Sequence, residues 1–228
     1  MPTPAPIRIA CTLSLLALLG APLTAQTCLG FPAFATGPVN ASGSVSIGTE
    51  WWGAGAHANV GHRAGGLFGG ANAGHIRFVD DPEESRLSVG LLGGYDRMTG
   101  GQLHICPFAT AAYERGGFVT RLDGDRSKIS GQVLGIGIAF AGESQSGRFR
   151  SFSVAPFISA RFTYISTHEE IDGGETSKND ETGASVVAGL GFRLRDAIQI
   201  TPSFATSTFE NADLVFTLKV SVALQPRR

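Results

Sequence analysis

The sequence predicts an all-β fold: an antiparallel up-and-down transmembrane β-barrel of about ten strands, with eight strands also possible. Segments of about ten residues alternate between apolar and small or polar side chains, and turn-forming residues separate them. The chain of 228 residues contains 31 glycines and 16% charged residues. Its hydrophobic content of 43% is too high for a disordered chain. The formal net charge of -1 provides no basic excess, so we expect no nucleic-acid partner.

Residues 1–25 have the pattern of a secretory signal peptide. Arg8 supplies the positive charge, residues 9–20 form a short apolar stretch, and the segment ends at Ala25 with cleavage expected before Gln26. The apolar stretch is shorter than the ~20 residues of a membrane-spanning helix. No later run of apolar residues reaches that length. We therefore expect an exported chain that is either soluble or a β-barrel.

Ten strands are predicted where the alternation is regular. They cover 42–49, 52–61, 67–78, 86–97, 102–114, 129–141, 150–167, 183–194, 198–207 and 214–224. No change of composition divides them. The predicted organisation is therefore a signal peptide at 1–25, an N-terminal segment at 26–41 and one barrel domain at 42–228.

The two faces of the strands differ in bulk. In the last strand Leu218 and Val220 share one face, whereas Lys219 and Ser221 share the other. A soluble β-protein would turn the bulky face inward, and a membrane barrel would turn it toward lipid. The length of the apolar face and the glycine- and serine-rich opposite face favour the membrane barrel. A soluble periplasmic barrel that binds an apolar ligand is the alternative.

The predicted connections alternate in length. Short or medium ones cover 98–101, 142–149 and 195–197, and longer polar ones cover 79–85, 115–128, 168–182 and 208–213. Membrane barrels have short periplasmic turns and longer outside loops. An even number of strands then places both termini in the periplasm. Trp51, Trp52, Tyr113 and Tyr164 fall near the outer strand ends, where aromatic side chains suit a membrane interface.

Two cysteines remain after removal of the signal peptide. Because an exported chain meets an oxidising compartment, Cys28 and Cys106 are predicted to form a disulfide, with two buried free thiols as the alternative. Cys28 precedes the first strand, and Cys106 points to the lumen near the start of the fifth. The bridge would hold the N-terminal segment at the periplasmic mouth, and we hypothesise that this segment forms a partial plug.

The alternating glycine-rich strands resemble the small outer-membrane β-barrel proteins of the OmpA/OmpX-like class. The resemblance rests on Val133-Leu134-Gly135-Ile136-Gly137 and Val187-Ala188-Gly189-Leu190-Gly191-Phe192, and it extends over about 42–224. Leu224 is followed by four further residues, where such proteins usually end with an aromatic residue. Members serve as membrane anchors, adhesins, small pores or lipid-modifying enzymes, so the resemblance implies a bacterial outer-membrane location and no particular reaction.

Charged residues also occur on the small-residue face of the strands. The six are Arg86, Asp96, Glu114, Arg161, Arg193 and Lys219. We expect them to face the lumen and to pair with one another, because buried charges require partners; a solute path is the alternative. Side chains nearly fill the interior of a barrel of eight to ten strands, so the lumen is expected to be narrow or closed.

No residue pattern predicts catalysis. The histidines lack metal-ligand spacing, so neither a metal nor a cofactor is expected. Ser166, His168 and Glu170 lie two residues apart at an outer strand end, which keeps a lipid-directed barrel hydrolase as an alternative. The expected role is structural or surface-interacting. We expect a monomer that contacts outer-membrane lipid and lipopolysaccharide and that meets the barrel-assembly machinery during insertion.

Overall fold

The computed structural model describes residues 39–61, 66–79, 84–99, 103–120, 126–142, 144–145, 152–171, 176–194, 198–209 and 213–224. These residues form strands β1 (Val39–Ile47), β2 (Trp51–Val60), β3 (Gly66–Phe78), β4 (Ser85–Thr99), β5 (Leu103–Thr120), β6 (Arg126–Gly142), β7 (Ser144–Gln145), β8 (Phe152–Ile171), β9 (Thr176–Leu194), β10 (Ile198–Ser207) and β11 (Val215–Leu224). Within these ranges no helix is long and apolar enough to span a membrane.

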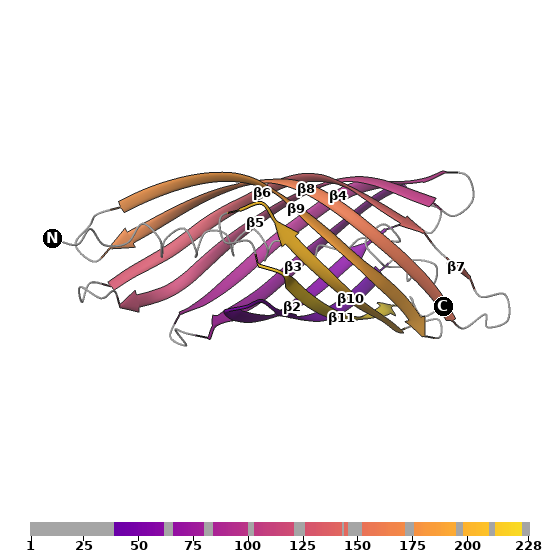
Figure 1. The fold of residues 1–228 in the computed structure, drawn as a ribbon, viewed down its shortest axis with the longest axis horizontal. Coiled ribbons are helices and arrows are strands. Elements are labelled where there is room, and N and C mark those ends of the chain that lie inside the picture. Colours follow the sequence, from indigo (N-terminus) through magenta and orange to yellow (C-terminus); the bar gives the residue numbers. More distant parts are fainter. Residues whose placement is uncertain are drawn as a thin grey trace.

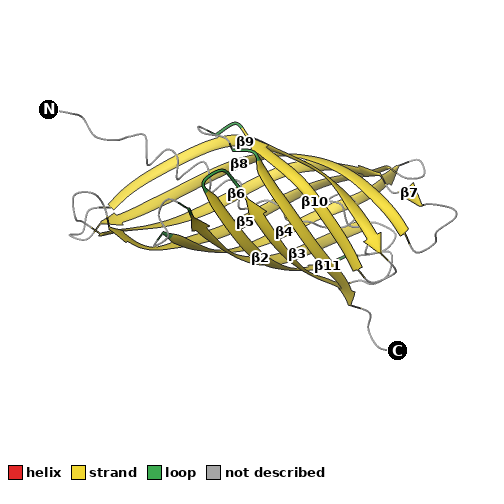
Figure 2. Cartoon of the chain, turned by 60° about the horizontal axis from the view of Figure 1, so that its bottom comes forward, coloured by secondary structure: helices red, strands yellow, loops and turns green. Residues whose placement is uncertain are grey.

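Ten long strands close into a barrel, and the short β7 extends the wall beside β8. Each long strand pairs antiparallel with its neighbour in the chain; β6 pairs with β8, and β1 pairs with β11 to close the wall. Figures 1 and 2 show the strands crossing the wall at a slant. This arrangement confirms the predicted up-and-down barrel and gives ten strands rather than eight.

The slant follows from the register of the wall. A path along paired residues leaves β5 at Gly116, passes through every neighbouring strand in turn, and returns to β5 at His104, 12 residues earlier. Such a stagger requires strands tilted by about 35–45° from the barrel axis. Each residue then advances roughly 2.5 Å along the axis, since an untilted strand rises about 3.3 Å per residue.

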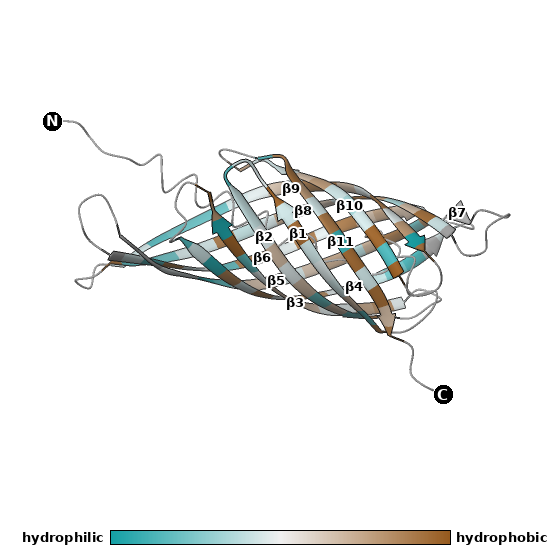
Figure 3. Ribbon diagram, turned by 90° about the horizontal axis from the view of Figure 1, so that it is seen from below, coloured by the Kyte–Doolittle hydropathy of each residue, from teal (hydrophilic) through white to brown (hydrophobic). Residues whose placement is uncertain are grey.

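Apolar side chains cover the outside of the wall. Ile136 is 66% exposed, and Ile158 and Leu218 are also exposed, whereas the alternate residues face the interior. In Figure 3 apolar residues recur along β10 and β11, and the exposed apolar residues of these strands include Phe204, Leu218 and Val220. The interior faces carry serine, threonine, asparagine and isolated charges. The prediction that the bulky face looks outward is therefore confirmed.

The two ends of the barrel differ. Val39 pairs with Leu224, so the first and last described strand ends lie together at one end, which we call the terminal rim. The opposite end, the distal rim, carries the connections from β1 to β2, β3 to β4 and β10 to β11. Both ends of the described chain thus lie at the same rim, as an even strand number requires.

The strands β5, β6, β8 and β9 continue beyond the distal rim as a four-stranded extension, which we call the raised sheet (115–120, 126–131, 165–171 and 176–182). Figure 1 shows these strand ends reaching past those of the indigo and purple strands. The prediction of loops at 115–128 and 168–182 is wrong for most of their length, because strands occupy 115–120, 126–128, 168–171 and 176–182. These segments are mostly polar, and their few apolar residues, among them Ile129, Ile165 and Ile171, do not form the regular alternation that would mark the pairing.

The start of the barrel also differs from the prediction. β1 begins at Val39, three residues before the predicted strand and inside the segment assigned as 26–41. Asn40 is buried on the inward face, so the polar and small residues at this position follow the interior pattern of the barrel. Trp51 likewise points inward and is buried, which leaves Trp52 as the tryptophan that faces outward.

Inward-facing aromatic rings lie over glycines of the neighbouring strand. The directly paired residues are Phe68 with Gly94, Phe108 with Gly137, and Phe157 with Gly189. A Cβ atom on Gly189 would lie 2.7 Å from Cε1 of Phe157. The two carbons would clash at this distance, so a residue with a Cβ atom does not fit at this position. The ring therefore requires glycine at that position, and three such pairs narrow the lumen.

Candidate functional site: the lumen and the raised sheet

All six charged residues singled out in the sequence are buried in the barrel, each at most 7% exposed. They lie on five strands, β4, β5, β8, β9 and β11. Arg86 pairs with Glu84 at the distal rim and lies over the ring of Phe78, 5.1 Å from its centre. Glu114 lies two residue pairs from Arg86 in the β4–β5 register.

Asp96 has a partner that the sequence analysis did not name. Its carboxylate lies 2.9 Å from Nδ1 of His104, and both side chains are buried near the terminal rim. The alternation of β5 places His104 and Cys106 on the same inward face, so a partner for Asp96 on the adjacent strand could have been sought there.

Arg161 and Lys219 lie deeper in the barrel than the charges at the rims. Lys219 pairs across the wall with Thr201 of β10 and Ser44 of β1. Oγ of Ser44 lies 2.9 Å from Nε2 of His57, and the amide of Gln199 donates to Thr201 at 3.0 Å. A cavity of about 40 Å³ beside Ser44 and His57 is large enough for water. The interior of β10, β11, β1 and β2 is therefore largely polar.

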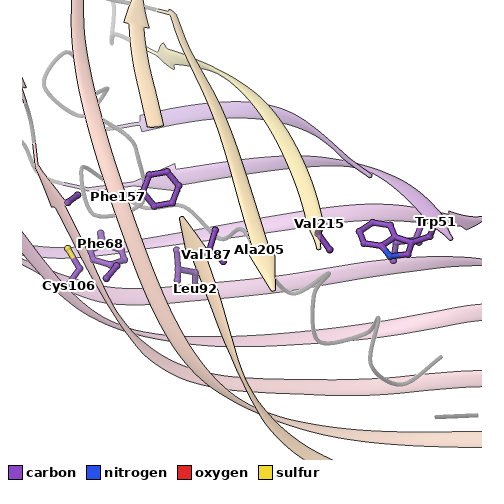
Figure 4. Packing of buried hydrophobic residues seen from close by; sticks show 11 residues of the cluster. Trp51, Phe68, Leu92, Cys106, Phe157, Val187, Ala205 and Val215 are labelled. Carbon is purple, nitrogen blue, oxygen red and sulfur yellow. The ribbon is translucent and has the colours of Figure 1, made fainter. Parts of the chain in front are cut away.

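The interior also carries an apolar cluster, which lies mostly on the other strands and includes Trp51 of β2, Ala205 of β10 and Val215 of β11. Phe68, Leu92, Cys106, Phe157 and Val187 are all buried in it. Figure 4 shows Phe68 close to Cys106, and Leu92 close to Val187. The thiol position of Cys106 is thus fully enclosed. Cys28 and the N-terminal segment up to residue 38 lie outside the described residues, so their predicted bridge and plug are not described.

A second apolar cluster closes the distal mouth on one side. Phe209 follows β10, is 3% exposed, and packs with Val133 and Ile165. Its neighbour Thr208 is clamped to β9 by two hydrogen bonds: its backbone N–H donates to the carbonyl of Ala184 at 2.8 Å, and its Oγ1 accepts from the Ala184 N–H at 2.9 Å. We call Phe209, Val133 and Ile165 the distal seal. The sequence analysis missed it because a loop residue has no periodicity.

The raised sheet carries a groove on its outward face. The groove has a volume of about 360 Å³ and is lined by Tyr113, Arg115, Lys128, Ser130, His168 and Glu170. Glu169 and Thr176 complete its border. We call it the rim groove. It brings cationic, anionic, hydroxyl and aromatic groups together on four adjacent strands, β5, β6, β8 and β9.

The candidate hydrolase residues lie on this same part of β8. Ser166 pairs across to Asp180 and His168 to Lys178. The pKa of the Asp180 carboxyl is lowered, first by a hydrogen bond from Ser166 and then by one from Lys178, whose Nζ lies 2.9 Å from the carboxylate. The Ser166 hydroxyl is thus directed to Asp180. Within the described ranges no cluster of His, Cys, Asp and Glu forms a metal site.

No protein-family model matches the chain, and no curated protein matches its sequence. The translocator domain of autotransporter NalP from Neisseria meningitidis is similar in structure, with a TM-score of 0.55 and 10% identity over 82% of this chain and 88% of that one. Lower scores are found for Ail, the attachment invasion locus protein of Yersinia pestis (0.40; 11% identity; 81% and 95% covered), and for the KdgM porin (0.39; 7%; 82% and 99%). The chain has the fold of outer-membrane β-barrels, and the likeness extends to the fold alone.

Proposed function

We propose that this protein is an integral barrel of the bacterial outer membrane that presents the raised sheet at the cell surface. The observation that carries this proposal is the orientation of the wall. Exposed leucine, isoleucine, valine and phenylalanine side chains surround it, whereas serine, threonine and charged side chains are buried inside. An apolar exterior of this extent is unfavourable in water and suits acyl chains.

The proposal places the terminal rim, and with it both termini, in the periplasm. Connections at the distal rim join the longest strands, and outside segments of such barrels are generally the longer ones. Trp52, Tyr113 and Tyr164 lie toward the distal ends of their strands, and the first two are exposed on the outer surface, as expected near the headgroups.

The role that fits this arrangement is surface interaction rather than bulk transport. Three aromatic–glycine pairs and the distal seal narrow the interior. The raised sheet, by contrast, offers polar groups on both faces, and most of its β9 residues are exposed. We further propose that the protein is a monomer, that membrane lipid and lipopolysaccharide contact its wall, and that the barrel-assembly machinery inserts it.

Fractionation and labelling test the location and orientation. We expect the mature chain to sediment with outer membranes, to resist carbonate washing, and to shift in gel migration on heating after refolding in detergent. A membrane-impermeant maleimide should label a Ser177→Cys variant in intact cells, and a Thr99→Cys variant only after permeabilisation, each compared with the unsubstituted chain. A chain recovered in the soluble periplasmic fraction would contradict the proposal.

The proposal assigns no reaction to the chain, and the hydrolase alternative has its own test. Purified protein is incubated with phospholipid or lipopolysaccharide, and released fatty acid is measured for the parent, Ser166→Ala and His168→Ala. We expect no release above background from any of the three. Release by the parent that both substitutions abolish would establish the hydrolase instead.

The proposed disulfide and partial plug concern the terminal mouth. Removal of residues 26–38 should accelerate solute entry in a liposome-swelling assay if that segment restricts the lumen. Equal swelling rates for the full and shortened mature chains would rule out a plug while leaving the membrane assignment intact.

A further inference from the structure

The rim groove begins where the apolar exterior ends. On the outward face of β6, Leu134 is half-exposed, and Gln132, Ser130 and Lys128 follow it toward the raised end. On β5, Tyr113 is followed on the same face by Arg115. Ser130 pairs with Arg115 on one side and with His168 on the other, so the three strands form one continuous floor. In the membrane proposed above, this floor lies just outside the acyl-chain region.

The groove is a built cavity rather than a flat surface. Its volume of about 360 Å³ lies within the usual range of small-molecule sites, about 300–1,000 Å³. Tyr113 contributes a half-exposed ring with a polar tip, which suits a ligand that has both apolar and hydroxyl faces. None of the described residues that line the groove has an aliphatic side chain, and this lining does not fit an acyl chain.

The charges in the groove discriminate between classes of ligand. Arg115 and Lys128 are donors, and Glu170, which pairs directly with Lys128 in the β6–β8 register, is an acceptor on the same outward face; Glu169 is on the opposite face by the alternation of β8. A bare phosphate would meet a carboxylate as well as two cations. A sugar has hydroxyl groups that donate and accept, and it can use both kinds of partner together with Ser130 and Thr176.

We propose that the rim groove binds a core sugar of lipopolysaccharide. This inference rests on the proposed outer-membrane location, because only there does the groove meet the sugars adjoining lipid A. It names the saccharide, rather than the phosphates or acyl chains of the same lipid, as the ligand. Tyr113 stacks on the sugar ring, Arg115 and Lys128 donate to its oxygens, and Glu170 accepts from its hydroxyl groups.

The experiment uses delipidated core oligosaccharide as the probe and the full mature chain in detergent. Isothermal titration should show saturable binding, and Tyr113→Ala and Glu170→Gln should each raise Kd at least about tenfold. The barrel provides matched controls on β4, near the terminal rim. Tyr95 is 49% exposed against 45% for Tyr113, and Arg97 is an outward-facing arginine like Arg115. Tyr95→Ala and Arg97→Ala should leave Kd unchanged. Heat-modifiable migration verifies the folding of each variant, and Glu170→Gln retains the shape of an exposed side chain if Tyr113→Ala fails to fold.

Two further arms decide the outcome. Lipid A without core sugars should not compete with the oligosaccharide, and an unrelated neutral oligosaccharide of equal length should not bind. Competition by lipid A, binding of the unrelated sugar, equal losses in the control variants, or no saturable binding would each overturn the proposal. These failures differ from failure of the proposed function, in which the chain would not fractionate with the outer membrane.

Discussion

The cost of placing an arginine on the outer wall measures what that wall faces. Ile136 is central in the apolar outward run of β6, between Leu134 and Ile138, and it is 66% exposed. Gln132 lies on the same face of the same strand, four residues nearer the distal rim. At roughly 2.5 Å of axial rise per residue the two positions differ in depth by about 10 Å. Their substitution by arginine therefore compares the membrane centre with its boundary.

We expect Ile136→Arg to lower the free energy of unfolding by about 2–4 kcal/mol and Gln132→Arg to lower it by about 0–1 kcal/mol. The difference arises because a cation at the bilayer centre is desolvated, whereas one near the interface reaches headgroups. Reversible denaturant unfolding in lipid vesicles provides the measurement, with tryptophan emission as the signal. If Ile136 instead faced water, both substitutions would change stability by less than about 0.5 kcal/mol. Equal costs at the two positions would refute the reasoning.

Four other outcomes follow from the interior and the raised sheet. Phe209→Ala should open the distal seal and raise single-channel conductance in planar bilayers. Phe204→Ala, on the outer wall, should leave the conductance unchanged. Unchanged conductance in both variants would show that Phe209 does not restrict the lumen. Peptide mapping without reduction should yield Cys28 linked to Cys106, and Cys106→Ser should cost about 2–4 kcal/mol of stability; a map that contains only the separate peptides would disprove the bridge. Gly189→Val should lower the free energy of unfolding by at least about 1–3 kcal/mol, because its Cβ would lie 2.6 Å from the Pro202 carbonyl oxygen and 2.7 Å from the Phe157 ring. A Cβ at Gly93 meets nothing within 4 Å, so Gly93→Ala should lower the stability far less. The pKa of Asp180, followed by NMR, should lie below its ordinary value of 3.8 and should rise in Ser166→Ala. Because folding lowers this pKa, any stability gained from the carboxylate is present above the unfolded-state pKa. That stability is lost as the pH falls through the folded-state pKa.

The wall of the barrel could be predicted from the sequence because one physical signal repeats in it. A period of two with bulky residues on one face places Leu218 outward and Lys219 inward without knowledge of the partner strands. The same rule could have separated Trp51 from Trp52, since neighbouring residues in a strand face opposite sides. Both were instead expected near the interface because their positions at a hairpin were considered without the alternation.

The raised sheet and the distal seal could not be predicted in this way. In the raised sheet backbone pairing continues between His168 and Lys178 although neither face is apolar, so the pairing has no counterpart in side-chain hydropathy. Phe209 is buried by contacts with β6, β8 and β9, which are distant in the sequence. The rim groove likewise depends on the register of three strands, which places Arg115, Ser130 and His168 side by side.

The pairing of β1 with β11 has a consequence for biogenesis. Val39 pairs with Leu224 where β1 and β11 close the barrel. The chain is synthesised from β1 to β11, so the backbone hydrogen bonds of β1 remain incomplete until β11 is present. Contacts of such long sequence separation slow folding, because the entropy of closing a long loop is lost before the contact forms. Until then the chain has open strand edges and exposed apolar side chains, both of which favour aggregation.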